Sequence, residues 1–180
     1  MSESVLITYA TRYGSTKEVA EKIAQILIHD EFEVEVLPCK KVDTIEQYQF
    51  IVIGAPYYIG GMLKDAKNFL LRNQDMLSKK PVAFFALGPI GETEKELTET
   101  QNQLDKELKQ FPWFKPISTV MFGGKYNPKK LRLLDKFLTL PPASPLHNLA
   151  ANDARNWEDI KNWAEKITAS LISIKNPSIQ

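Results

Sequence analysis

Short apolar runs alternate along the chain with segments in which apolar residues recur at helical spacing. Runs rich in β-branched and aromatic residues predict buried strands, and the run at 32–37, which alternates with glutamates, predicts a strand with a more solvated side. The predicted strands are residues 5–9, 32–37, 50–54, 81–87 and 117–122. The predicted helices are residues 15–28, 63–77, 94–108, 129–138 and 157–172.

This alternation predicts βαβ crossovers, and therefore an α/β fold with a parallel sheet and helices on both faces. Five strands in such a doubly wound sheet take the order 2-1-3-4-5. The chain of 180 residues is close to the usual length of one domain, and no internal repeat, low-complexity stretch or linker divides it. We expect one domain over residues 1–180, with an extra segment at about 125–146 after the last strand.

The composition is typical of a globular protein in a reducing compartment. The single cysteine, Cys39, cannot form a disulfide within the chain or make a zinc site. The chain shows no signal peptide and no apolar run of the roughly 20 residues that cross a bilayer. We therefore expect a cytoplasmic protein with no nucleic-acid partner.

The net charge of +1 hides a basic stretch between Lys109 and Lys136, where seven Lys or Arg residues accompany one acidic residue, Asp135, for a local charge of +6. A solvated face is one interpretation. The other is a docking surface for an anionic membrane or an acidic partner. Residues 129–138 would form a basic amphipathic helix, which either packs on its own domain or lies on the inner face of a membrane.

In an open α/β sheet, ligands bind beyond the carboxyl ends of the strands, near the point where the strand order reverses. For the order 2-1-3-4-5 that point lies between the first and third strands. Four loops meet at this edge, and each has an unusual composition. These loops are residues 10–16, 55–61, 88–93 and 123–128.

The loop at residues 10–16 has the composition of a phosphate site. Thr11, Ser15 and Thr16 supply hydroxyl donors, Gly14 lets the backbone close around an anion, and the first turn of the next helix supplies free N–H groups. The alternative is an ordinary helix start, because Ser15 and Thr16 followed by Glu18 resemble a capping box.

Other nucleotide sites do not fit this loop. The chain has neither the Gly-x-Gly-x-x-Gly turn of dinucleotide-binding proteins nor the Gly-Lys-Ser/Thr of a P-loop. A phosphoacceptor receiver domain shares the topology, but it needs carboxylates where this chain has Gly54 and Ala10-Thr11. These classes are therefore excluded.

The other loops indicate a flat ligand. Tyr57 and Tyr58 follow the third strand and could stack on an aromatic ring, although they could also only cover the sheet edge. Glycines nearby permit close approach of the backbone. The loops at 88–93 and 123–126 add further glycines at the same edge. A wide aromatic ligand with a phosphate tail would use all four loops.

Together these residues resemble the flavodoxin superfamily across nearly the whole chain. The resemblance is to the flavodoxin-domain branch that includes menaquinone-dependent protoporphyrinogen oxidases. It departs from the common family pattern at Tyr13, where that pattern has a threonine. The segments that carry it are Tyr9-Ala-Thr-Arg-x-Gly-Ser-Thr16, Gly54-Ala-Pro-Tyr-Tyr-Ile-Gly-Gly, Gly88-Pro-Ile-Gly91, Phe122-Gly-Gly-Lys-Tyr and Arg155-Asn-Trp-Glu-Asp-Ile.

The resemblance implies a flavodoxin-like fold that binds FMN, with the phosphate in residues 11–16 and the ring between the loops at 57–60 and 88–93. The cofactor-binding residues that it implies are Thr11, Arg12, Tyr13, Gly14, Ser15, Thr16, Pro56, Tyr57, Tyr58, Ile59, Gly60, Leu87, Gly88, Pro89, Gly91, Thr93 and Tyr126. We expect no metal site and no catalytic acid or base, since neither His29 nor His147 neighbours a carboxylate cluster in the sequence.

The implied function is electron transfer by an FMN-binding protein, with a redox partner protein or a quinone as the partner. One alternative is a menaquinone-dependent protoporphyrinogen oxidase of heme biosynthesis, because in this branch an insertion at the place of the extra segment is associated with that activity. A second alternative is a non-catalytic module that has kept the fold and lost the flavin.

Overall fold

The computed structural model describes residues 4–58, 61–91, 93–137, 140–142, 144 and 146–175, with the backbone alone at Tyr58, Leu134 and Lys175. Its central sheet has the order β2-β1-β3-β5-β6, and all these strands run parallel. The short β4 pairs antiparallel with the end of β3, off this path. The predicted order 2-1-3-4-5 is therefore confirmed. The strands are β1 (Ser4–Tyr9), β2 (Glu33–Pro38), β3 (Phe50–Tyr58), β4 (Gly61–Met62), β5 (Val82–Leu87) and β6 (Ser118–Phe122).

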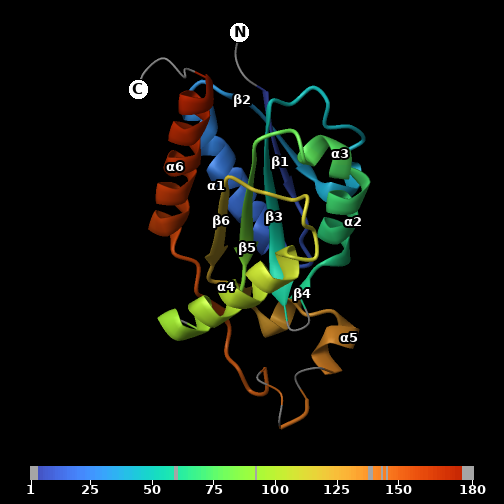
Figure 1. The fold of residues 1–180 in the computed structure, drawn as a ribbon. Helices are drawn as coiled ribbons and strands as arrows, with labels where there is room; N and C mark the ends of the chain where they lie inside the picture. Colours follow the sequence, from blue (N-terminus) through green and yellow to red (C-terminus); the bar gives the residue numbers. More distant parts are fainter. Residues whose placement is uncertain are drawn as a thin grey trace.

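Helices cover both faces of the sheet, as Figure 1 shows. On one face lie α1 (Ser15–His29) and α6 (Trp157–Lys175), which contact each other. The other face is covered by α2 (Lys64–Arg72), α3 (Gln74–Leu77) and α4 (Glu94–Leu108). The short 3₁₀ helix η1 (Cys39–Lys41) follows β2.

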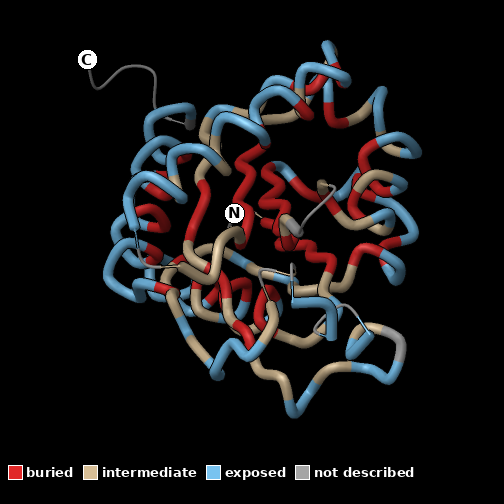
Figure 2. Tube along the Cα trace, turned by 90° about the horizontal axis from the view of Figure 1, so that it is seen from below, coloured by how far each residue is buried: buried red, intermediate tan, exposed pale blue. Residues whose placement is uncertain are grey.

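Each face of the sheet has its own hydrophobic core, because successive side chains of a strand point to opposite faces. In β5, Phe84 packs under the α2 side, while Phe85 packs with Phe122 and Trp163 under the α6 side. All six residues of β5 are buried. Figure 2 shows the same pattern, with buried residues in the sheet and on the inner helix faces and exposed residues outside.

Two predicted helices are wrong in extent. The helix predicted at 63–77 is broken at Asn73, whose backbone leaves helical geometry (φ −109°, ψ 17°), so α2 and α3 are separate. The amphipathic helix predicted at 129–138 does not form. A 3₁₀ turn, η2 (Pro128–Lys130), is followed by extended backbone at Leu131 and Arg132 (ψ 137° and 155°) and then by the one-turn α5 (Leu133–Lys136). Residue 138 lies outside the described residues.

In the structure the extra segment runs from β7 to β8, past the predicted end at about 146, and its two ends lie side by side. Strands β7 (Lys125–Tyr126) and β8 (Asn152–Asp153) pair antiparallel, and the N–H of Ala154 donates to the carbonyl of Gly124 at 2.9 Å. The residues between β7 and β8 lie beyond the carboxyl edge of the main sheet, at the bottom of Figure 1. The segment is therefore placed over the edge at which the four loops meet.

Among the described residues, none of the helices combines the length and hydrophobicity that a membrane crossing requires.

Gly54 in the middle of β3 is a packing constraint. A Cβ there would lie 2.2 Å from the ring of Phe85 on the neighbouring strand. We expect Gly54→Ala to lower the free energy of unfolding by about 1–3 kcal/mol, because overpacking a core forces neighbours out of their rotamers. Urea unfolding measures the change. In a Phe85→Leu background the same substitution is expected to cost less, and an equal cost in both backgrounds would contradict this account.

Candidate functional site

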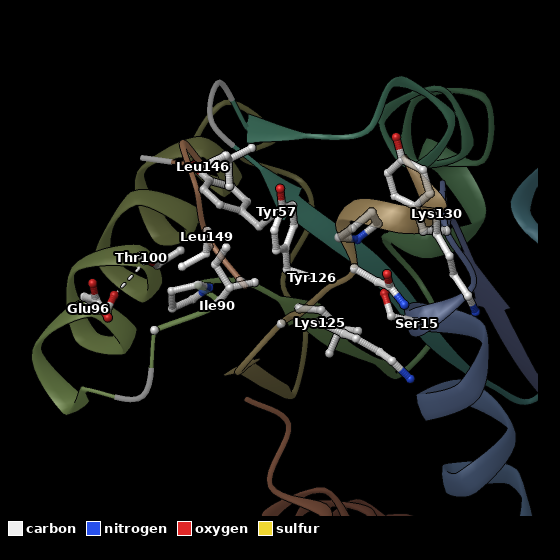
Figure 3. A pocket seen from close by; sticks show the side chains of 18 of the residues that line it. Ser15, Tyr57, Ile90, Glu96, Thr100, Lys125, Tyr126, Lys130, Leu146 and Leu149 are labelled. Carbon is white, nitrogen blue, oxygen red and sulfur yellow. Dashed lines mark hydrogen bonds between the residues drawn. The ribbon is translucent and has the colours of Figure 1, made fainter. Parts of the chain in front are cut away.

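A pocket of about 480 Å³ opens at the carboxyl edge of the sheet, within the size range of ordinary ligand sites. All four loops predicted from the sequence contribute to it, together with α4 and the extra segment. In Figure 3, Tyr57 and Tyr126 lie at its centre, Leu146 and Leu149 on the α4 side, and Ser15 and Lys130 on the α1 side. The site therefore lies where the strand order reverses, between β1 and β3.

The structure brings nine of the predicted cofactor-binding residues together in the wall of this pocket. They are Tyr13, Ser15, Pro56, Tyr57, Leu87, Gly88, Pro89, Gly91 and Tyr126. Thr11, Arg12, Gly14, Thr16 and Thr93 do not line it. Ile59, Gly60 and the side chain of Tyr58 lie outside the described residues.

Thr93 has a structural role. It is the N-cap of α4, and its hydroxyl accepts a hydrogen bond from the N–H of Glu96 at 3.3 Å. The Glu96 carboxylate accepts in turn from the Thr93 hydroxyl at 3.0 Å. Thr93 thus stabilises the start of a helix whose side chains Glu96, Thr100 and Gln103 line the pocket.

The loop at residues 10–16, called the anion loop after the ligand that its composition predicts, leads into the start of α1. Gly14 is its N-cap with φ +93°, a conformation that favours glycine, and its N–H donates to the Thr11 hydroxyl at 2.9 Å. The capping box does not form, since no side chain caps α1 and the carboxylate of Glu18 pairs with Arg155 and Lys125 instead. The first turn of α1 therefore keeps N–H groups that no cap satisfies.

Thr16 is fully buried in this first turn, and its hydroxyl is the buried side-chain polar atom that finds no hydrogen-bond partner among the described residues. A buried hydroxyl without a partner costs about 1–3 kcal/mol, so such atoms call for an explanation. A bound anion at the N-terminus of α1 would supply the missing acceptor.

The extra segment is bound to the same loop through Asp135 of α5. One carboxylate oxygen pairs with Arg12 at 3.0 Å, and the other accepts a hydrogen bond from the Tyr13 hydroxyl. Burial and this hydrogen bond raise the pKa of Tyr13, so the phenol stays protonated and remains a donor. The departure from the family's common threonine at position 13 thus provides a link between the anion loop and the extra segment.

A compact ion cluster lies beside the first turn of α1 and contacts it. The guanidinium of Arg155 is almost fully buried and donates to the carbonyl of Ser15 at 3.3 Å. It pairs with Glu18 at 2.8 Å and with Asp153 at 2.6 Å, and Lys125 pairs with both of these carboxylates at 3.3 and 3.4 Å. Two positive and two negative charges therefore balance beside the first turn of α1.

This cluster changes the acidities of its carboxylates. The hydrogen bonds from Arg155 lower the pKa of Asp153 and outweigh the effect of burial. Burial alone would raise the pKa of Glu18, but hydrogen bonds and charge from Arg155 and Lys125 outweigh it, so the pKa is lowered. Both groups stay ionised at neutral pH.

The ring side of the pocket is aromatic and apolar. Tyr126 is buried, and Tyr57 is partly buried against the core under α2 and α4. Burial, with a smaller contribution from Glu107, raises the pKa of Tyr57. Further apolar wall is supplied by Leu131, Leu146 and Leu149 of the extra segment. A flat, mostly apolar ligand fits between these walls.

Sequence reasoning missed two parts of the site. Arg155 carried the family resemblance without an assigned role, because only the fold brings it next to Glu18. Leu131 was assigned to a helix face, whereas its backbone is extended and its side chain lines the pocket together with Leu146 and Leu149, to which the sequence assigned no role. The hydrophobicity of the segment was the available signal for the second part.

Cys39 and metal chemistry do not contribute to this site. Burial raises the pKa of the Cys39 thiol to about 11, so it stays protonated. Within the described part of the chain, no group of His, Cys, Asp and Glu side chains could hold a metal ion.

A doubly wound α/β fold with an anion loop and an aromatic-lined pocket at its switch point defines the class of this protein. The family model for the flavodoxin domain matches residues 6–139, and the chain belongs to that family.

Two kinds of relative support this assignment. The chain is 24% identical over 171 residues to the protoporphyrinogen IX dehydrogenase (quinone) of Escherichia coli strain K12, with 90% of this chain and 93% of the relative covered. Flavodoxin 1 of Bacillus cereus in its oxidised form superposes with a TM-score of 0.57 at 17% identity, covering 93% and 98% of the two chains. Rubredoxin oxygen:oxidoreductase of Desulfovibrio gigas superposes with a TM-score of 0.57 at 18% sequence identity, covering 94% of this chain and 36% of the other. At these identities the two solved structures show the fold alone.

The ion cluster predicts a pH dependence of stability. Because the pKa of Asp153 is lower in the folded chain than its unfolded value of about 3.9, its contribution is present above that value and is lost as the pH falls through the folded pKa. We therefore expect Asp153→Asn to lower stability at pH 7 and the difference from the unsubstituted protein to shrink below about pH 4. Urea unfolding at a series of pH values measures this.

Glu99→Gln is the matched control, because Glu99 belongs to an exposed pair with Lys95 at 3.9 Å. Exposed pairs contribute about 0–1 kcal/mol, so this substitution is expected to change little at any pH. A stability difference for Asp153→Asn that stays constant from pH 7 to pH 3 would contradict the account.

Proposed function

We propose that this chain binds FMN in the pocket at the carboxyl edge of the sheet and acts in electron transfer. The observation that carries the proposal is the juxtaposition of an anion loop with an unpartnered buried hydroxyl, Thr16, and an aromatic pocket of about 480 Å³ at the switch point. Membership of the flavodoxin-domain family supports it.

The residues present fit the two ends of FMN. The phosphate would be held by residues 11–16, through the N–H groups at the start of α1 and the hydroxyls of Ser15 and Thr16. The ring would lie against Tyr57 and Tyr126, where aromatic contacts stabilise by about 0.5–1.5 kcal/mol beyond burial. Pro56, Leu87, Gly88, Pro89 and Gly91 form further parts of the wall. When bound, FMN supplies one- and two-electron chemistry, which polar groups around the ring adjust.

The chain itself positions the ligand and excludes water. Leu131, Leu146 and Leu149 from the extra segment narrow the pocket, and Asp135 links that segment to the anion loop. The buried Arg155 donates to the carbonyl of Ser15 and so fixes the first turn of α1, while Glu18 and Asp153 balance its charge. None of these side chains needs to exchange a proton for electron transfer to occur.

Thr16→Val tests the proposal, because valine keeps the shape of threonine and removes the hydroxyl. A hydrogen bond to a charged group contributes about 1.5–3 kcal/mol, so FMN affinity is expected to fall by roughly 10- to 100-fold. Without FMN the same substitution is expected to raise the free energy of unfolding by about 1 kcal/mol, since it removes an unpartnered buried hydroxyl. Quenching of flavin fluorescence and urea unfolding measure the two effects.

Thr168→Val is the matched control. Thr168 is also buried, but its hydroxyl donates to the carbonyl of Ala164 within α6. This control is expected to leave FMN affinity unchanged. If the unsubstituted protein neither quenches flavin fluorescence nor shows the visible bands of a flavoprotein, the proposal fails in favour of a module that has lost the flavin.

A second candidate function is oxidation of protoporphyrinogen with a quinone as electron acceptor. The activity for which the Escherichia coli relative is named motivates it, since the match covers 90% of this chain and 93% of the relative. The contribution of the extra segment to the pocket wall favours it over a simple carrier, because such a wall can receive a second flat molecule.

The surface of the extra segment supports a quinone partner within a membrane. Leu133, Phe137 and Leu140 are 78%, 65% and 63% exposed, and they lie among Lys129, Lys130, Arg132 and Lys136. Although the predicted helix does not form, exposed apolar side chains beside basic ones are typical of a contact with an anionic bilayer. We propose that the protein is cytoplasmic and that this surface meets the inner face of the membrane.

An anaerobic assay with protoporphyrinogen tests the second candidate. With FMN loaded, we expect quinone-dependent oxidation when menadione is present, and faster turnover when the quinone is embedded in anionic vesicles. Leu133→Ser with Phe137→Ser is expected to remove the vesicle effect and to preserve turnover with soluble menadione, because both side chains are exposed. Absence of flavin reoxidation by either quinone would reject this candidate, and equal turnover with and without vesicles would reject the membrane contact.

A further inference from the structure

Glu107 of α4 is a buried carboxylate close to the pocket but outside its wall. The residue is only 8% exposed, and among the described residues it is the one acidic side chain that is buried. A buried charge is costly unless ion pairs and hydrogen bonds compensate for it. The rest of α4 is largely polar and exposed, so the placement of this carboxylate needs a reason.

The Glu107 carboxylate binds two other elements of the fold. Its Oε1 pairs with Lys67 of α2 at 2.5 Å, and the backbone N–H of Met62 in β4 donates to Oε2 at 3.1 Å and, over a longer distance, to Oε1 at 3.4 Å. Gly61 lies directly beside the carboxylate, with φ +110°, and a Cβ there would lie 2.6 Å from Oε2. The carboxylate therefore packs against the backbone of the β3–β4 hairpin and leaves no room for a side chain at position 61.

This hairpin carries one aromatic wall of the pocket. Met62 is the strand partner of Tyr57, and Gly61 is the partner of Tyr58. Tyr57 lines the pocket, and Glu107 contributes to raising its pKa. Glu107 therefore acts on Tyr57 in two ways, through the backbone of Met62 and through the direct interaction of its carboxylate with the Tyr57 hydroxyl.

We propose that Glu107 is a positioning residue: its carboxylate fixes the β3–β4 hairpin and thereby holds Tyr57 in the place where it meets a flat ring. The proposal rests on the proposed function for the identity of the ring. It differs from a general stabilising role, because it makes ring binding depend on Glu107 and leaves phosphate binding independent of it.

Glu107→Gln is the test, because glutamine has a similar shape but replaces the charged acceptor with a neutral amide that offers one acceptor oxygen, so the contacts with Lys67 and with the N–H of Met62 are both weakened. Binding of FMN and of riboflavin, which has no phosphate, is measured by fluorescence quenching. We expect both affinities to fall by the same factor, about tenfold for one hydrogen bond to a charged group. Thr16→Val is expected to lower the affinity for FMN and to leave the affinity for riboflavin unchanged.

Hydrogen exchange at the amide of Met62 provides a measurement that needs no flavin. In the unsubstituted protein this amide donates to Glu107, and in Glu107→Gln we expect it to exchange about tenfold faster. Glu99→Gln on the exposed face of the same helix is the matched control and is expected to change neither exchange nor binding.

A second variant separates stability from positioning. Lys67→Met removes the counter-ion and leaves Oε2 as the acceptor for Met62, so stability is expected to fall while Met62 exchange and the FMN-to-riboflavin affinity ratio stay unchanged.

Two outcomes would overturn the inference. One is an unchanged exchange rate of the Met62 amide in Glu107→Gln, and the other is a loss of affinity for FMN without a loss of affinity for riboflavin. If the unsubstituted protein binds no flavin, the proposed function fails, and the exchange measurement still decides whether Glu107 holds the hairpin.

Discussion

Parallel pairing of β1 with both β2 and β3 is the constraint on which the rest of the structure depends. Because β1 pairs with a strand on each side, the connections after β1 and after β3 cross opposite faces of the sheet. The chain leaves the carboxyl end of β1 toward one face and the carboxyl end of β3 toward the other. The space between these exits cannot be filled by a crossover helix. Loops close it instead, and the anion loop and the Tyr57 hairpin occupy its two sides.

The extra segment completes this space without disturbing the sheet. Its two ends are joined by the β7–β8 pair, so its base is fixed beside the main sheet. Asp135 attaches it to Arg12 and Tyr13, and its leucines face the pocket. The segment thus turns an open crevice at a sheet edge into a pocket with walls on several sides.

The sheet was predictable because local patterns decide it. Continuous apolar runs such as β5 have few alternatives to a strand buried on both faces, and the loops at the carboxyl edge follow from the topology. The parts of the site that were predictable are those in which the residues of one loop are close together in the sequence. The pairs Arg155–Glu18 and Asp135–Tyr13 join residues far apart in the sequence, and the helix at 129–138 failed because the extended backbone at Leu131 and Arg132 overrides its periodicity.

The contact between Arg155 and Ser15 has a consequence for how the protein is made. It joins residues 140 positions apart, and Arg155 lies two residues before α6, the last helix of the described chain. Synthesis proceeds from the N-terminus, so most of the sheet can assemble on the ribosome before Arg155 emerges. The anion loop is therefore supported only after all strands of the main sheet have been synthesised. A nascent chain would form its sheet before its ligand-binding loop, which delays loading of the ligand until Arg155 is in place.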